Sequence, residues 1–255
     1  MTLTELDEYF RTFLKIDDFL DDPSKNGIQI ANSLPNSKQI KKAAFAVDAC
    51  EATALIAAKE GADLLFTHHG VLWDNCERLT MHTYKRISAF IKNDIALYAC
   101  HLPLDANNPY GNNYGLAARL PLLEPTPFGE WRGMKIGVKG KLESPQTLEW
   151  LAKKILNTDE KPCRVLNFGK KEIRTVGIIS GGGGGDVYQA AAEGLDAYVT
   201  GEISHDNFHL IKELQINVIA GGHYQTETVG VQLVMEKLKS ETGIETVFID
   251  FPTGM

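Results

Sequence analysis

The sequence has few cysteines and no long apolar run. Its four cysteines among 255 residues form no C-x-x-C pair, so the usual zinc and redox spacings are absent. No stretch approaches the ~20 apolar residues of a membrane helix. The first five residues are polar and acidic, unlike a signal peptide. These absences predict reduced cysteines and a cytoplasmic protein without a membrane partner.

Basic residues are also scarce. The 26 Lys and Arg against 33 Asp and Glu give a net charge of −7 and a pI near 5.5, which argues against a nucleic-acid partner. The proportions of hydrophobic and charged residues, 44% and 23%, are typical of globular proteins and exclude disorder as the main state. Histidine is rare, yet two of the seven, His68 and His69, are adjacent.

Strand-length apolar runs alternate with helical patterns along the first half of the chain. The expected strands are residues 42–47, 63–67 and 95–100, and the expected helices are 51–60 and 80–93. Thr2 and Glu5 form a capping-box pattern for a further helix that ends near Leu14. This alternation predicts a mainly parallel sheet covered by helices on both faces.

A loop-like segment precedes the second half. Residues 120–133 contain three prolines and two glycines, which predicts a linker and a domain boundary near residue 125. Beyond it we expect strands at 134–138, 164–168, 174–179, 197–200, 216–220 and 245–250, and helices at 146–156, 187–193, 206–214 and 226–240. The sequence therefore predicts an α/β fold of two α/β/α-type units with mainly parallel sheets. These units are residues 1–125 and 126–255, with a metal site between them.

Metal-type side chains follow three of the predicted strands. They are His68, His69, Asp105, His223 and Glu227. Ligands gather outside the carboxyl ends of parallel strands, and positions i and i+4 share one helix face. Any one of these residues could instead be a core histidine, a turn residue or a helix cap. Their conjunction at three strand ends favours a metal site.

Five nitrogen and oxygen ligands exceed the three that one catalytic zinc ion normally takes. Two divalent ions are therefore predicted, and mixed imidazole and carboxylate ligation suits zinc, iron or manganese. Such a pair can lower the pKa of a shared water to about 7 and polarise a carbonyl, amidine or phosphoryl group. A metal-dependent hydrolase of a small anionic substrate is the first hypothesis. A non-catalytic protein that stores, delivers or senses metal would use the same ligands.

Other residues have two interpretations each. Glu202 follows an expected strand and is the predicted catalytic carboxylate for proton transfer, or else a helix cap. The run Gly181–Gly185 could cradle a phosphate, but it lacks the P-loop pattern, so a tight turn is favoured. His101 is expected to orient the Asp105 loop or a metal-ligating side chain. His205 and His209 are expected to face solvent or to support a ligand.

Several motifs together resemble one protein family along nearly the whole chain. They are Ser24–Gln29, Thr67–Gly70, His101–Ala106, Gly111–Asn113, Asp196–Glu202, Gly221–Glu227 and Phe248–Asp250. They resemble the NIF-three-like family of dinuclear-metal proteins, whose members often carry the label GTP cyclohydrolase I type 2. Gly70 stands where the family commonly has proline, and the tail 251–255 differs from the family's Asn-Pro-type ending. Neither departure removes a ligand.

The resemblance implies a fold, a site and an assembly. It implies two α/β domains in each subunit and hexameric rings or cages with paired metals facing an inner cavity. The implied ligands are the same five residues, His68, His69, Asp105, His223 and Glu227. The implied reaction is a purine-ring hydrolysis of the GTP cyclohydrolase kind, although no guanine-recognition motif is visible in the sequence.

Overall fold

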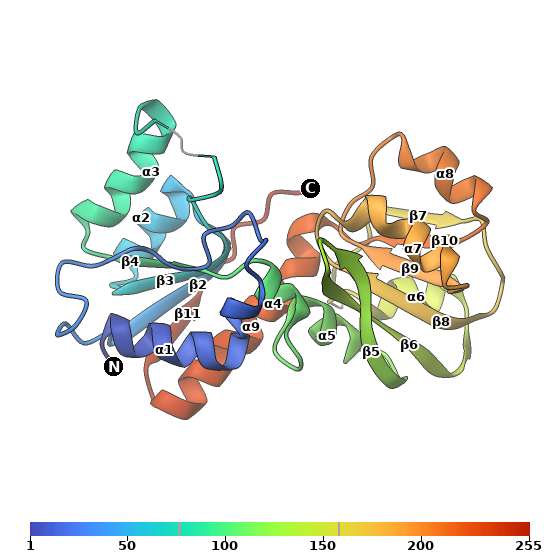
Figure 1. Cartoon of the computed structure of the whole chain (residues 1–255), viewed down its shortest axis with the longest axis horizontal. Coiled ribbons are helices and arrows are strands. Elements are labelled where there is room, and N and C mark those ends of the chain that lie inside the picture. Colours follow the sequence, from blue (N-terminus) through green and yellow to red (C-terminus); the bar gives the residue numbers. More distant parts are fainter. Residues whose placement is uncertain (76–77, 158) are drawn as a thin grey trace. The chain divides into compact units, whose positions relative to one another are not determined.

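The computed structural model describes residues 1–75, 78–157 and 159–255, which divide into two compact units (Figure 1). Unit 1 comprises Met1–Leu104 and Val231–Phe251, and unit 2 comprises Asp105–Gly230 and Pro252–Met255. This division differs from the predicted boundary at residue 125. The chain leaves unit 1 about 20 residues earlier than predicted, and its C-terminal part returns to unit 1.

Unit 1 contains a five-stranded sheet in the order β1-β4-β3-β2-β11. Its strands are β1 (Gly27–Ile30), β2 (Lys42–Asp48), β3 (Leu64–His69), β4 (Ala96–Ala99) and β11 (Glu245–Phe248). Strand β1 runs antiparallel to β4, and the other neighbours are parallel. The predicted parallel arrangement is confirmed in this unit. Strand β11, from the end of the chain, completes the sheet beside β2.

Helices cover both faces of this sheet (Figure 1). They are α1 (Leu3–Leu14), α2 (Glu51–Lys59), α3 (Met81–Lys92) and the C-terminal part of α9 (His223–Thr242). Alternate strand residues point to opposite faces. Leu65 and Leu97 join Phe90 of α3 in one buried cluster. Phe66 and Tyr98 lie against Phe10 of α1, with ring centroids 5.0 and 4.8 Å away.

The start of α1 confirms the predicted capping box. The backbone N–H of Glu5 donates to the Thr2 hydroxyl, and the backbone N–H of Thr2 donates to the Glu5 carboxylate. These bonds satisfy two of the amides that a helix N-terminus leaves without internal acceptors.

Unit 2 contains a six-stranded sheet in the order β5-β6-β8-β9-β10-β7. Its strands are β5 (Leu122–Trp131), β6 (Met134–Gln146), β7 (Arg164–Asn167), β8 (Ile173–Ile179), β9 (Ala197–Thr200) and β10 (Asn217–Ala220). Only β8, β9 and β10 run parallel, and the other three pairs are antiparallel. The α/β class is thus confirmed, but this sheet is mixed rather than mainly parallel.

The helices of unit 2 are short. They are α5 (Asn112–Ala117), α6 (Leu148–Lys154), α7 (Val187–Ala192) and α8 (Asn207–Glu213), with a 3₁₀ turn at Gly183–Asp186. Helices α4 (Leu102–Ala106) and α9 each contain a passage of the chain between the units. In the part of the chain that the structure describes, no helix combines the length and the apolar character needed to cross a membrane.

The predicted linker at residues 120–133 is wrong, because most of this segment is strand β5. The linker was predicted because prolines are frequent in loops. Pro125 and Pro127 lie on an edge strand of the sheet, where a missing N–H costs little because one side of the strand has no neighbour. Arg132 and Gly133 have φ of 48° and 79° and form the turn into β6.

Candidate metal centre

The adjacent histidines lie at the end of β3 rather than beyond it. The expected strand 63–67 continues to His69, which pairs with Asp48 of β2. His68 is fully buried, and the His69 side chain is 20% exposed. Successive side chains of a regular strand point to opposite faces, yet these two ring centroids are 4.5 Å apart. The strand end therefore brings both imidazoles to one place.

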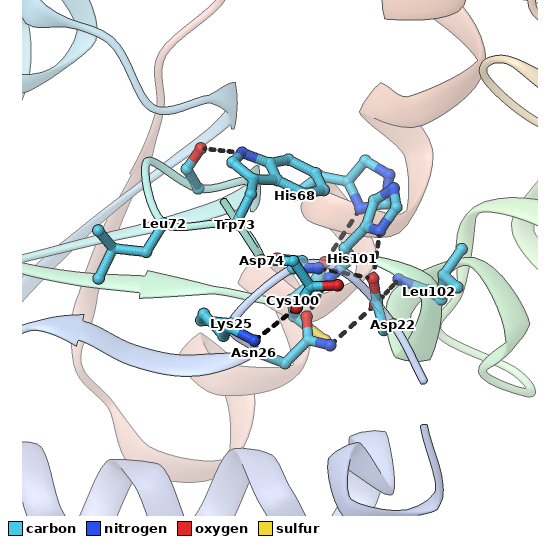
Figure 2. A network of polar contacts seen from close by, with 12 residues as sticks. Asp22, Lys25, Asn26, His68, Leu72, Trp73, Asp74, Cys100, His101 and Leu102 are labelled. Carbon is cyan, nitrogen blue, oxygen red and sulfur yellow. Dashed lines mark hydrogen bonds and ion pairs between the residues drawn. The ribbon is translucent and has the colours of Figure 1, made fainter. Parts of the chain in front are cut away.

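Oxygen acceptors fix the orientation of three imidazole rings in unit 1. The contacts are His68 Nδ1 to the Cys100 carbonyl at 3.0 Å, His69 Nδ1 to Asp48 Oδ1 at 2.8 Å and His101 Nδ1 to Asp22 Oδ1 at 2.9 Å. Figure 2 shows those of His68 and His101. A carbonyl or carboxylate oxygen only accepts, so each Nδ1 carries the hydrogen. In the neutral ring, the lone pair that can bind a metal is then on Nε2.

His101 joins the two adjacent histidines. Its ring centroid lies 5.1 Å from that of His68 and 5.6 Å from that of His69. One ligand nitrogen from each ring lies within 4.8 Å of the other two. From the sequence, His101 is expected to orient the Asp105 loop or a metal-ligating side chain. Its position two residues after β4, which neighbours β3 in parallel, was the signal that places it at the same sheet edge.

A buried carboxylate, Asp22, holds His101 in place. Its side chain is 0% exposed. It accepts hydrogen bonds from His101, the backbone N–H of Leu102 and the Asn26 amide (Figure 2). The backbone N–H of Ser24 donates to it as well. Burial alone would raise the pKa of Asp22, but His101 and the other donors outweigh it and lower the pKa below its ordinary value. The sequence carried no signal for Asp22, which lies in a loop far from His101 along the chain.

Unit 2 brings together the other three predicted ligands. Helix α9 begins at His223, so His223 and Glu227 lie one turn apart, as expected. His223 Nε2 is 3.2 Å from Glu227 Oε1, and the Glu227 side chain is 4% exposed. A carboxylate oxygen of Asp105 lies within 4.8 Å of one of Glu227. Within this unit, Glu227 therefore lies close to both His223 and Asp105.

Glu202, the predicted proton-transfer residue, contacts the other nitrogen of His223. Its Oε1 lies 3.3 Å from His223 Nδ1, and its side chain is 47% exposed. Glu227, the largest cause, and Glu202 raise the pKa of His223 to about 9 despite partial burial. In the metal-free chain this imidazole holds a proton at neutral pH, and a cation that binds it must displace that proton. The role of Glu202 in proton transfer stays a prediction.

Two polar side chains orient Asp105. Asp105 lies in the short helix α4 rather than in the expected loop. Its Oδ1 accepts hydrogen bonds from the Asn112 amide and the Ser180 hydroxyl, both at 2.9 Å. The Asn112 oxygen accepts from the backbone N–H of Gly230 in α9. Asn112 thus ties Asp105 to the helix that carries His223 and Glu227.

The glycine run packs against the same helix. Gly181 has φ of 58°, and a Cβ built on it would lie 2.0 Å from Glu227 Oε1. Its carbonyl accepts the backbone N–H groups of Gly201 and Glu202, both at 3.0 Å. These contacts support the tight-turn interpretation, because only glycine combines this backbone angle with so close an approach.

The remaining three histidines are exposed. His82 lies in α3, His205 just before α8, and His209 within α8. The structure thus places His205 and His209 at the surface, which agrees with the expected solvent-facing role. All three offer matched controls for substitutions at the buried histidines.

These donor groups fit divalent cations. Imidazole and carboxylate ligands are those preferred by zinc, iron and manganese. Oxygen atoms of the protein already orient the rings in unit 1, which is the usual support for metal-binding histidines. Groups of His, Asp and Glu side chains in this chain could therefore hold metal ions.

The fold and the ligand groups define an α/β protein with a candidate metal centre, and comparison places it in a family. The Duf34/NIF3 (NGG1p interacting factor 3) family model matches residues 1–254. The chain is 45% identical over 289 aligned residues to the GTP cyclohydrolase 1 type 2 homolog of Treponema pallidum, with all of both chains covered. It is 40% identical to the Deinococcus radiodurans protein of the same name, covering 98% of this chain and 94% of that protein.

A solved structure agrees with this assignment. The Thermus thermophilus protein TTHA1606 has a TM-score of 0.89 and 36% identity to this chain, with both chains fully covered. The chain therefore belongs to the Duf34/NIF3 family, as its motifs predicted.

Proposed function

We propose that this protein binds two divalent metal ions and is a hydrolase of the GTP cyclohydrolase 1 type 2 homolog class. The proposed ligands are His68, His69, Asp105, His223 and Glu227. The observation that carries the proposal is that each unit holds metal-ligating side chains in defined positions. Unit 1 fixes two adjacent imidazoles by their Nδ1 atoms, and in unit 2 the buried carboxylate of Glu227 lies close to both His223 and the buried carboxylate of Asp105.

The course of the chain supports the idea that the two ligand groups act together. The chain passes from unit 1 to unit 2 between Leu104 and Asp105, and returns between Gly230 and Val231. Asp105 is the first residue after one passage, and Glu227 lies three residues before the other. Ligands of unit 2 are thus covalently close to unit 1, as a shared centre requires.

The chemistry of the ligands favours hydrolysis of an anionic substrate. Bound divalent ions would supply Lewis acidity and lower the pKa of water toward neutrality. Asp105 and Glu227 contribute −2 against +4 from two such ions, so the centre keeps a positive charge that attracts anions despite the acidic chain. Glu202 is half-exposed beside His223, where it would exchange a proton between the site and solvent.

Metal analysis followed by a hydrolase screen tests the proposal. The purified protein should contain two divalent ions per chain and turn over a member of a panel of nucleotides including GTP, other phosphoesters and amides. His68→Ala and Glu227→Ala should each reduce turnover at least about 100-fold, since losing a residue that merely orients a ligand already costs 10–100-fold. His209→Ala, at an exposed histidine, should leave both metal content and turnover unchanged.

Two results would contradict the proposed function, one against the metal ligands and one against the catalytic activity. Metal content unchanged in His223→Ala and Asp105→Ala would show that these residues are not ligands. Full occupancy by metal without turnover of any substrate class would favour the non-catalytic alternative, a protein that stores or delivers metal or acts as a ring-shaped scaffold.

A homohexamer and a cytoplasmic location are part of the same proposal, and the hexamer rests on the family resemblance. Six chains of 28.1 kDa give about 169 kDa. Light scattering of the protein as it elutes from a size-exclusion column should give this mass. A monomer mass of 28.1 kDa would refute the hexamer.

A further inference from the structure

We infer that Trp73 stacks on a planar heteroaromatic ring of the substrate, such as a nucleobase, and thereby selects the substrates of this protein. The inference rests on the proposed function, because it places that ring beside the candidate metal centre. It concerns binding through the face of the indole and assigns no metal ligand.

The indole lies beside imidazoles at the end of β3. Its ring centroid is 6.3 Å from that of His69 and 5.1 Å from that of His101. The interplanar angles are 38° and 75°, so neither imidazole forms a parallel stack with the indole. Trp73 is half-buried, and Figure 2 shows it close to His101. These contacts leave an indole face on which a flat ring can stack.

One side chain of β1, Gln29, holds the loop that carries Trp73. Its Oε1 accepts the backbone N–H groups of Val71 and Leu72, at 2.7 and 2.9 Å. Its Nε2 donates to the carbonyls of Lys25 and Leu72, at 2.9 and 3.1 Å. Gln29 thus binds the loop at three backbone atoms, and the loop is fixed before any ligand arrives.

Further contacts fix the indole itself. Its N–H donates to the Gly70 carbonyl at 3.2 Å (Figure 2). The backbone of Trp73 forms a β-bridge with Ser24, and the next residue, Asp74, pairs with Lys25 at 2.6 Å. A ring held in this way loses little conformational freedom when a ligand stacks on it, so most of the stacking contributes to affinity.

The fold does not need the indole to anchor this loop. Val71 packs against the buried hydrophobic cluster of unit 1, and Gln29 binds the loop backbone. Leu72, which precedes Trp73, is 38% exposed. Tryptophan offers a large apolar surface, and a half-buried one leaves part of that surface unused in folding. Beside a candidate metal centre, such a surface is suited to a ligand.

Nucleobases suit this platform. Each base has a π-face that stacks on an aromatic side chain, and tryptophan supplies a large rigid contact area at low entropic cost. A base on Trp73 would lie beside His69 and His101, next to the centre proposed for hydrolysis. The ring of the substrate, and not its negative charge alone, would then decide which molecules bind.

The first test uses Trp73 as its own probe. The variant Trp131→Phe/Trp150→Phe leaves Trp73 as the one tryptophan of the chain. It is titrated with GMP and with ribose 5-phosphate, which has the same sugar and phosphate without the base. GMP should quench the fluorescence of Trp73 and, in equilibrium dialysis, bind at least about 5-fold more tightly than ribose 5-phosphate. Equal binding of the two, or no binding of GMP, overturns the inference.

The second test removes the indole. Trp73→Leu should weaken GMP binding about 5–150-fold, whereas Trp73→Phe keeps a π-face and should lose less. Trp131→Ala, at a half-buried tryptophan of unit 2, should bind GMP as the parent does. Metal content should equal that of the parent in all three variants. Unchanged GMP binding in Trp73→Leu, or a loss of metal that accompanies the loss of GMP, overturns the inference.

The outcomes separate this inference from the proposed function. GMP binding that depends on Trp73, in a protein that turns over no substrate, supports the inference and refutes the hydrolase. Turnover of a substrate without a ring, unaffected by Trp73→Leu, supports the hydrolase and overturns the inference. If Trp73→Leu does not fold, the comparison of GMP with ribose 5-phosphate in the first test still decides.

Discussion

Asp22 and Asp48 each place a carboxylate oxygen against Nδ1 of a histidine, while Asn112 and Ser180 hold the carboxylate of Asp105. None of these four residues is a proposed ligand, yet together they determine where ligand atoms point. The identities of the five proposed ligands were predictable from the sequence, because imidazole and carboxylate side chains after apolar runs are a local pattern. Their supporting residues were not, because they lie up to 79 residues away along the chain.

Gly181 offers a sharp test at the residue scale. Gly181→Ala puts a methyl group 2.0 Å from Glu227 Oε1 at a φ of 58°, so either the backbone or the carboxylate must move. We expect a loss of about 1–3 kcal/mol in stability from backbone strain and steric conflict, and weaker Co²⁺ binding. Thermal unfolding and metal titration measure the two effects.

Gly185→Ala is the matched control for this substitution. Nothing lies within 4 Å of a Cβ built at Gly185, and its φ is not in the left-handed region. It should keep the metal affinity of the parent and match or exceed its stability. Equal losses in both variants would contradict the proposed close packing of Gly181 on Glu227.

At the scale of helices and strands, hydrophobic periodicity predicted the presence of most elements better than the residues at which they begin and end. Strand β3 runs on to His69, and β5 occupies a segment that looked like a linker. In both cases, pairing with a neighbouring strand decides the outcome. His69 pairs with Asp48, and β5 pairs along most of its length with β6. Such contacts override local propensity, since strand preference depends strongly on neighbours.

Asp196 links two strands and makes stability depend on pH. It is 7% exposed and accepts the backbone N–H groups of Arg174 and Thr175 in β8, just before its own chain enters β9. Burial alone would raise the pKa of Asp196, but the hydrogen bond from Lys170 and these amides outweigh it and lower the pKa. A lowered pKa stabilises the folded state at pH values above the pKa of the same carboxyl in the unfolded chain, about 3.9. This stability is lost as the pH falls through the lower pKa of the folded state.

Asp196→Asn should therefore cost about 2 kcal/mol of unfolding free energy at pH 7, and the difference from the parent should shrink below about pH 4. Urea unfolding at pH 7 and pH 3 measures both values. Glu172→Gln, which removes an exposed ion pair with Arg174, should change stability by less than about 1 kcal/mol. A cost for Asp196→Asn that is the same at both pH values would show that the carboxylate charge is unimportant.

At the scale of the whole molecule, the chain builds unit 1 from both of its ends. Residues 231–251 belong to unit 1, where β11 pairs in parallel with β2. Helix α9 accordingly starts in unit 2 with His223 and Glu227 and continues into unit 1. The two units are therefore joined by a regular helix as well as by helix α4.

Removal of residues 245–255 should damage unit 1 selectively. The deletion takes away β11 and Ile249, which is 4% exposed in the unit 1 core and whose burial alone contributes about 1.5–3 kcal/mol. Hydrogen exchange should accelerate in β2, while β8 and β9 of unit 2 keep their protection. Removal of residues 252–255 alone should leave both units protected. Equal loss of protection in β2 and β9 would contradict the expected selective effect on unit 1.

The sequence by itself determined the α/β class and the family, because these depend on local periodicity and on side-chain chemistry that each residue carries with it. The five ligands that it suggests stay a prediction. Only the tertiary structure decided which residues share a unit, that β11 completes the first sheet, and that His101 joins His68 and His69. These features depend on pairing and hydrogen bonds between segments up to about 200 residues apart. Such contacts are selected by the burial and hydrogen bonding of the whole chain, which no local pattern reports.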